Sequence, residues 1–333
     1  MNAKENALAI LRFGQPERVV GGLPCQGLSY FGVDHESLDG DGGHHLPVGR
    51  QWTDIWGTTW HKEHEGVMGF PRGHPITCLS DLATYPWPDP DDERLCARIY
   101  TQASAAFDRD TLFLSGSHRD TLWEKSYMLC GMERMMEWLL CEPQAAQEIL
   151  HRIMDFQVGM ARHYLAAGIE VAHCGDDLGT QSAPLLAPRL ITELFAPEYR
   201  RLFDLYRAHG VIVSFHSCGH IEPLLPLFMD LGIDCLNPIQ ATANDLTRVR
   251  RLTQGRMALQ GGISSGLLVG GPAAAIRAEV RRTLWTLGRE GGYFCSPDQG
   301  MPWPEEHIQT FREALDQWGR YPLRPESIAL TEN

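Results

Sequence analysis

The stretch Val211-Ile212-Val213-Ser214-Phe215-His216-Ser217-Cys218-Gly219 contains a strand that runs into two metal-binding residue types. Four of its first five residues are apolar, which is typical of a buried strand, and a helix-like segment starts at Ile221. Side chains alternate along a strand, so His216 and Cys218 point the same way, about 6 to 7 Å apart along the chain. The stretch therefore predicts a strand-to-helix unit with chemistry at the carboxyl end of the strand.

From residue 93 onward, strand-like and helix-like segments alternate. The clearest helix begins at Pro143 and is ended by Gly168, with apolar residues at spacings of three or four between them. The strand-like segments are residues 111–115, 169–173, 211–215, 233–236, 257–260 and 293–295. Such alternation predicts parallel strands joined by helices, in either a closed barrel or an open doubly wound sheet.

Polar residues and glycines follow the ends of five successive predicted strands, and this distribution favours the barrel. They are Asp176, His216, Cys218, Asn237, Gln240, the pair Gly261-Gly262, and residues 295–298. A barrel collects its chemistry at that rim from many strands, whereas an open sheet concentrates it at one crevice, and no glycine-rich dinucleotide motif is present. We therefore predict a single α/β domain over residues 1–333, a (β/α)8 TIM barrel, in which about six strands are visible and closure at eight is inferred.

The first 92 residues are predicted to form an irregular cap and entry segment before the regular part at residues 93–333. Residues 1–20 read as a short amphipathic helix and a turn, and short strands are expected at residues 29–33 and 76–79. The region is rich in glycine and proline and holds six histidines. We expect a solvated or substrate-covering loop there, not a second metal site, for His35, His44, His45, His61, His64 and His74.

The net charge of −13 and the pI near 5.5 argue against binding to nucleic acid or to an anionic membrane surface. No apolar run approaches the ~18 residues of a membrane span, and the amino terminus lacks the apolar core of a signal peptide. Nine scattered cysteines indicate a reducing cytoplasm and thiols used for packing or metal binding. The expected partners are small molecules or proteins, with a homodimer left open.

One imidazole and two thiolates would hold zinc and leave its fourth position open, which is the catalytic pattern. His216 and Cys218 supply two of these groups, and Cys295 is the candidate third, because the strand at residues 293–295 should end on the same rim. Such a site can activate a thiol or polarise a leaving oxygen. The alternative interpretation is that His216 is a hydrogen-bonded core residue and both cysteines only pack.

Two acidic residues, Asp176 and Asp177, also follow a strand. One of them could act as an acid or base or bind a cationic group, and the alternative is that either one caps the following turn. Cys174, just before them, is expected to pack in the wall of the barrel.

Several motifs together resemble the uroporphyrinogen decarboxylase superfamily. They are Gly175-Asp176-Asp177-Leu178-Gly179-Thr180-Gln181, the helices of residues 188–210, Phe215-His216-Ser217-Cys218-Gly219, residues 234–240, and Ser296-Pro297-Asp298-Gln299-Gly300. Within the superfamily the chain is more similar to the cobalamin-dependent methyltransferases, because the early Arg-Gln-Ala-Gly-Arg substrate loop of the decarboxylases has no counterpart here.

The resemblance implies a TIM barrel with zinc held by the His-x-Cys pair and a late cysteine. In the methylcobamide:coenzyme M enzymes that cysteine lies in a Pro-Gly-Cys-Gly turn, and the matching turn here is Pro297-Asp298-Gln299-Gly300, with Gln299 at the cysteine position. The third ligand is therefore Cys295, an oxygen such as that of Asp298 or Gln299, or absent.

The sequence thus predicts a zinc-dependent methyltransferase that moves a methyl group between a small methylated compound or thiol and a corrinoid, the corrinoid arriving on a partner protein or free. Asp176 and Gln240 are expected to orient the substrate, and Asn237, Gly261 and Gly262 to bind a cofactor. A metal-free decarboxylase acting over Asp176 is the second hypothesis, and it requires a basic cluster in the barrel mouth. A barrel that only binds a tetrapyrrole or another small ligand is the third.

Overall fold

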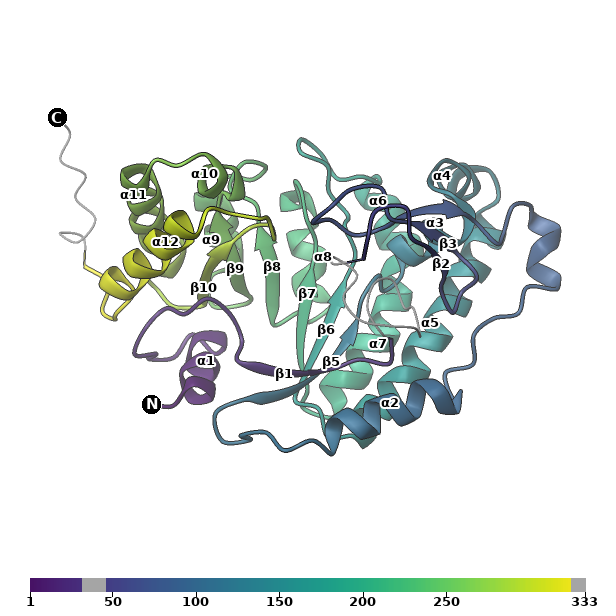
Figure 1. Ribbon diagram of the computed structural model, residues 1–333, viewed down its shortest axis with the longest axis horizontal. Coiled ribbons are helices and arrows are strands. Elements are labelled where there is room, and N and C mark those ends of the chain that lie inside the picture. The colour runs from purple at the N-terminus through teal and green to yellow at the C-terminus, as the bar shows by residue number, and fades with distance from the viewer. Residues whose placement is uncertain (32–45, 325–333) are drawn as a thin grey trace.

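A curled sheet of seven parallel strands organises the computed structural model, which describes residues 1–31 and 46–324 (Figure 1). The strand order is β1-β5-β6-β7-β8-β9-β10, so each strand from β5 onward pairs with the next one along the chain. The strands are β1 (Cys25–Leu28), β5 (Phe113–His118), β6 (Val171–Gly175), β7 (Ile212–His216), β8 (Cys235–Ile239), β9 (Ala258–Ile263) and β10 (Tyr293–Pro297). All their carboxyl ends therefore lie along one edge of the sheet.

Helices connect these strands and pack on the outer face of the sheet, as the alternation of the sequence predicts (Figure 1). The predicted helix after Pro143 is confirmed as α5 (Pro143–Ala166), with Gly168 at φ +82° just beyond its end. The other helices between strands are α2 (Glu93–Ala103), α3 (Trp123–Cys130), α4 (Met132–Cys141), α6 (Pro188–Leu190), α7 (Ala196–Ala208), α8 (Leu225–Asp230), α9 (Leu246–Thr253), α10 (Ser265–Gly270) and α11 (Ala273–Thr283), and α12 (Glu305–Trp318) follows the last strand. Short helical turns occur at Leu79–Ala83, Ile191–Phe195, Glu222–Leu224 and Leu284–Gly288. In the described ranges no helix is both long and apolar enough to cross a membrane.

The inner face of the sheet begins with an apolar layer at the amino-terminal ends of the strands. Helix α1 (Ala3–Leu11) closes this end and inserts Ala7 and Ile10 into the layer (Figure 1). The strands contribute Phe113, Val171, Cys235, Ala258 and Phe294. The alternate side chains of the same strands join the larger core between the sheet and the helices. The interior is thus packed at one end, and polar groups gather towards the other.

Closure of the sheet as an eight-stranded barrel is not reached in the described part of the chain. Seven strands are present, and strand β1 comes from the stretch predicted to be irregular, where it was missed because it is short, contains a glycine and follows Pro24. The amide of Cys295 in β10 donates to the carbonyl of Val20 at 2.9 Å. The segment that leads into β1 therefore touches the opposite edge of the sheet.

The N-terminal region also contains a small antiparallel sheet of β2 (Gln51–Thr53), β3 (Thr59–His61) and β4 (Phe70–Gly73). No strand forms at residues 76–79, where a 3-10 turn begins at Leu79. Of the other expected strand, residues 29–31 follow β1 without forming a strand, and residues 32 and 33 lie outside the described residues. Buried Asp54 organises this sheet by accepting from the Trp60 indole at 2.9 Å. The Lys125 ammonium of α3 lies 5.4 Å from the ring centre of Trp56, which joins the sheet to the regular part.

Among the early histidines, His61, His64 and His74 lie in the described residues, and none of them belongs to a group of potential metal ligands there. His61 lies 3.7 Å from Glu63, and the Nδ1 atom of His74 lies 2.7 Å from the carbonyl of Met128. His35, His44 and His45 lie outside the described residues.

Candidate metal centre

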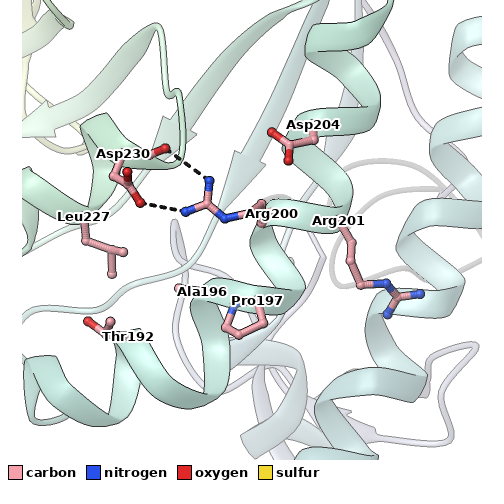
Figure 2. A pocket seen from close by; sticks show the side chains of 8 residues that line it. All are labelled: Thr192, Ala196, Pro197, Arg200, Arg201, Asp204, Leu227 and Asp230. Atoms are coloured by element: carbon pink, nitrogen blue, oxygen red, sulfur yellow. Dashed lines mark hydrogen bonds and ion pairs between the residues drawn. The ribbon is translucent and has the colours of Figure 1, made fainter.

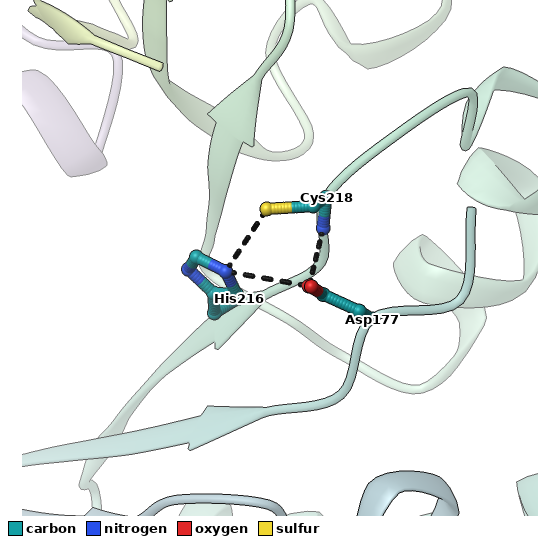
Figure 3. A group of neighbouring side chains, drawn as sticks. All are labelled: Asp177, His216 and Cys218. Atoms are coloured by element: carbon teal, nitrogen blue, oxygen red, sulfur yellow. Dashed lines mark hydrogen bonds and ion pairs between the residues drawn. The ribbon is translucent and has the colours of Figure 1, made fainter. Parts of the chain in front are cut away.

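His216 is the last residue of β7, and its imidazole is oriented by the neighbouring strand. Asn237 of β8 pairs with it in register, and the Asn237 Oδ1 atom lies 2.8 Å from His216 Nδ1. A proton on Nδ1 donates to that oxygen, which leaves the Nε2 lone pair facing the opening of the sheet. Nε2 lies 3.3 Å from the sulfur of Cys218 and 3.4 Å from Oδ1 of Asp177 (Figure 3).

Asp177, His216 and Cys218 form the one group of potential metal ligands found in the described residues, with donor atoms within 4.8 Å of one another (Figure 3). Asp177 lies in the loop after β6, His216 ends β7 and Cys218 lies in the loop after it. The Cys218 amide donates to Asp177 Oδ1 at 2.9 Å. The group offers one carboxylate oxygen, one imidazole nitrogen and one sulfur. These are the donor types that zinc accepts in proteins.

The loop that carries Cys218 is held by tight contacts and by Gln240. Gly219 has φ +86°, and a Cβ atom there would lie 2.4 Å from the Gly179 backbone, so only glycine fits. The Gly219 amide donates to the side-chain oxygen of buried Gln240. Gln240, expected to orient the substrate, is thus placed to fix the loop that carries a ligand.

Gln299, one of the alternative third ligands considered from the sequence, also reaches this centre. Its Nε2 atom lies 2.8 Å from the sulfur of Cys218 and can donate to it. Its backbone amide and carbonyl both bond the hydroxyl of Ser265, at 2.9 Å each, which anchors the turn. The side chain thus contacts a ligand sulfur through a hydrogen bond.

Cys295 is not part of the group. It faces the helices, because Phe294 belongs to the inner apolar layer and strand alternation sends its neighbours outward. The side chain is fully buried, and this burial raises the pKa of its thiol to about 12, with the Tyr293 side chain as hydrogen-bond partner. The expectation that Cys295 supplies the third ligand overlooked this outward direction, and the third member of the group of potential ligands is Asp177.

Asp176 and Asp177 have different surroundings although they are adjacent. Asp176 is fully buried and accepts from the amides of Leu122 and Glu124, at 2.8 Å each, and from the Tyr199 hydroxyl at 2.6 Å. Burial raises its pKa to about 7 against the opposing effect of these bonds. Asp176 therefore holds the start of α3, which is the capping alternative, and it faces away from the centre to which it was assigned.

Charges at the centre act on each other. Burial by itself lowers the pKa of His216, but the contacts with Asp177 and Cys218 outweigh it and hold that pKa well above its ordinary value. Burial tends to raise the pKa of Asp177, whereas His216 and the Cys218 amide and thiol lower it, with a net decrease. The nearby Glu124 has a pKa raised well above its ordinary value by burial, then by Asp120 and by the two aspartates after β6.

The two glycines assigned to cofactor binding have packing reasons for being glycine. Both have positive φ, and a Cβ atom on Gly261 would lie 2.7 Å from the Ile239 amide nitrogen. On Gly262 it would lie 2.8 Å from a methyl group of Thr283. Glu124 was not predicted from the sequence, because it lies in the first turn of α3, far along the chain from the motifs, and the role of Asp177 was left open.

A surface groove lies apart from this centre, between α7 and α8, and is lined in part by Ala196, Pro197 and Leu227 (Figure 2). The Arg200 guanidinium pairs with Asp230 across it at 2.6 Å. None of the three candidate ligands lines the groove.

Comparisons with known proteins find similarity to both decarboxylases and methyltransferases. Uroporphyrinogen decarboxylase of Edwardsiella ictaluri is 25% identical over 265 residues, which cover 73% of this chain and 69% of that protein. The methylated-thiol–coenzyme M methyltransferase of Methanosarcina mazei is 27% identical over 109 residues, 33% of this chain, and the chain spans only 28% of the length of that relative. A solved methyltransferase from Methanosarcina mazei superposes with a TM-score of 0.70 at 16% identity, covering 95% of this chain and 99% of that one, which shows a shared fold. Residues 123–318, more than half of the chain, match the uroporphyrinogen decarboxylase (URO-D) family, and the chain belongs to that family.

Proposed function

We propose that this protein is a zinc-dependent methyltransferase that moves a methyl group between a small methylated compound or thiol and a corrinoid carried by a partner protein. The observation that carries the proposal is the convergence of the Asp177, His216 and Cys218 donor atoms at the strand ends. The similarity to a methylated-thiol methyltransferase, although it covers a third of the chain, supports the same reaction class.

The spacing of the donor atoms fits zinc. Bond lengths of about 2.0 to 2.3 Å and tetrahedral angles place neighbouring donors about 3.3 to 3.6 Å apart. The distances from His216 Nε2, 3.3 Å to the Cys218 sulfur and 3.4 Å to Asp177 Oδ1, match that range. Three protein ligands leave a fourth position for substrate, which is the catalytic arrangement.

Bound zinc would lower the pKa of a substrate thiol or polarise the atom from which the methyl group departs. The residues of this chain prepare the ligands for that role. Asn237 fixes the imidazole, the Cys218 amide fixes the Asp177 carboxylate, and the Gln299 amide donates to the Cys218 sulfur. A hydrogen bond to a thiolate withdraws electron density from it, so Gln299 moderates the donor strength of the sulfur.

A metal-free decarboxylase is the second candidate, because the similarity to a uroporphyrinogen decarboxylase covers 73% of the chain. That reaction on a polycarboxylate needs cationic groups over the substrate. The described residues next to the centre are instead acidic, with Asp120 and Glu124 close to Asp177, and Arg119 lies 3.7 Å from Asp120. The charge therefore favours the methyltransferase.

The test is metal content by elemental analysis of the purified wild type beside His216→Ala and Cys218→Ala. We expect about one zinc per chain in the wild type and loss of the metal in both variants. Cys295→Ala is the matched control, since it removes a buried thiol outside the group and should keep the zinc. A wild type that stays free of zinc after supplementation under reducing conditions would exclude this proposal and favour the decarboxylase.

A further inference from the structure

Three successive rows of side chains line the inner face of the sheet between its closed end and the candidate metal centre, and the rows differ in polarity. Val171 and Ile212 belong to the apolar layer at the bottom. Two residues further along, Ser117, His173 and Ser214 face one another in register across β5, β6 and β7. The next row up contains His216, paired with Gly175 on one side and Asn237 on the other. The polar row of Ser117, His173 and Ser214 thus lies directly beneath the metal ligands.

This polar row carries hydrogen-bonding groups that the protein itself does not use. Across residues 1–31 and 46–324, no hydrogen bond joins the His173 ring, or the hydroxyl groups of Ser117 and Ser214, to another residue. Most buried polar groups of a folded protein have such partners. By contrast His118, which faces the helices, is bonded on both ring nitrogens, to Gln157 and Tyr206. The groups of the polar row are thus available to a ligand on the inner face of the sheet.

The polar row is uncharged near neutral pH, and its surroundings are acidic. Burial lowers the pKa of His173 to about 4, so the ring is neutral and offers one donor and one acceptor. Above it stands the Asp177 carboxylate, and no lysine or arginine occupies the row. A sulfonate or carboxylate placed here would lose its hydration without gaining a counter-charge, which is strongly unfavourable.

We infer that the substrate of this centre is an uncharged molecule, with its reactive sulfur or oxygen at Asp177, His216 and Cys218 and its polar end bound by His173, Ser117 and Ser214. The inference rests on the proposed function, since it assigns the substrate class of that centre. His173 is in this assignment a specificity-determining residue.

The experiment compares three thiols on the cobalt(II)-substituted full-length protein, whose visible spectrum reports both metal binding and thiol ligation. The thiols are 2-mercaptoethanol, 2-mercaptoethanesulfonate, which replaces the hydroxyl by an anion at the same spacing, and ethanethiol, which has no polar end. We expect 2-mercaptoethanol to bind at least about tenfold more tightly than the sulfonate. His173→Ala should weaken 2-mercaptoethanol about tenfold and leave ethanethiol unchanged, because only the former uses the polar row.

His163→Ala, which removes a half-buried histidine on the outer helix α5, is the control and should change none of the three affinities. Failure of cobalt to bind would overturn the proposed function, and this inference with it. Cobalt binding followed by a sulfonate affinity equal to or above that of 2-mercaptoethanol would overturn the inference alone. If His173→Ala does not fold, Ser214→Ala takes its place, and the wild-type comparison of thiols still decides the result.

Discussion

The inner and outer faces of the sheet differ most at the edge where the strands end. Both faces have acids, histidines and cysteines there. On the inner side Asp177, His216 and Cys218 bring their donor atoms together. On the outer side Asp176 and Cys295 are buried against helices. Residue type and nearness to a strand end therefore do not identify a functional group, and the direction of the side chain does.

The largest difference is expected between two neighbouring acids. Asp176→Ala removes the acceptor of two backbone amides and of the Tyr199 hydroxyl, all buried, so we expect a loss of about 3 to 5 kcal/mol in the free energy of unfolding. Asp177→Ala, measured without metal, should cost less than about 1 kcal/mol, because this side chain is half-exposed. Urea denaturation of the two metal-free variants measures both.

Equal losses in the two variants would contradict the assignment of opposite faces. The zinc content of the same samples gives a second check, since Asp177→Ala should lower metal binding. The folded fraction of Asp176→Ala should still bind zinc.

The alternation of side chains along a strand also explains which residues at this edge of the sheet could be predicted from the sequence. Six of the seven strands of the sheet were visible as apolar segments, and His216 and Cys218 were found because they follow such a segment two residues apart, although β7 ends at His216 and Cys218 lies in the next loop. Cys295 was misplaced although the start of the strand at Tyr293 was predicted correctly, because Tyr293, Phe294 and Cys295 are all apolar and show no alternation that distinguishes the inner face from the outer one. A shift of one residue exchanges the two faces.

The other features of the site and the fold depend on contacts between segments that are distant in the chain, so they could not be predicted from the local sequence. Glu124 lies more than 50 residues before Asp177 in the chain, and only the fold brings its carboxylate to accept from the Asp177 amide at 3.3 Å. The strand β1 and the sheet of β2 to β4 are short and interrupted by glycine and proline, so local preference alone does not reveal them. Contacts with distant elements stabilise them instead.

The comparison of the two faces also predicts a pH dependence of stability, tested with His118 on the outer face and His173 on the inner face. Burial lowers the pKa of outward-facing His118 to about 4, against about 6.5 in an unfolded chain. The unfolded state therefore binds the proton first, and His118 makes the protein less stable as the pH falls from 6.5 to 4, by roughly 3 kcal/mol at most. In His118→Gln that part of the decline should disappear, as measured by urea denaturation at several pH values.

His118→Gln should also lower stability at pH 7.5, by about 2 kcal/mol, because Gln157 and Tyr206 lose their partner. His173→Gln is the matched variant on the inner face. It should change stability at pH 7.5 by less than about 0.5 kcal/mol, since the ring has no protein partner to lose. A His173 variant as unstable as the His118 variant would mean that the polar row serves the fold and not a ligand.

The last prediction concerns Asn237, which would affect zinc binding through its contact with His216. Asn237 is placed to hold the His216 ring through its Nδ1 atom at 2.8 Å, so Asn237→Ala frees the ring to turn and to exchange tautomers. We expect zinc affinity to fall about 10-fold to 100-fold, with stability of the metal-free protein changed by less than about 1 kcal/mol. Competition with a chromogenic chelator measures the affinity. Asn237→Asp keeps an acceptor at the same place and should restore most of it, whereas equal affinities of Asn237→Ala and wild type would show that β7 alone orients the ring.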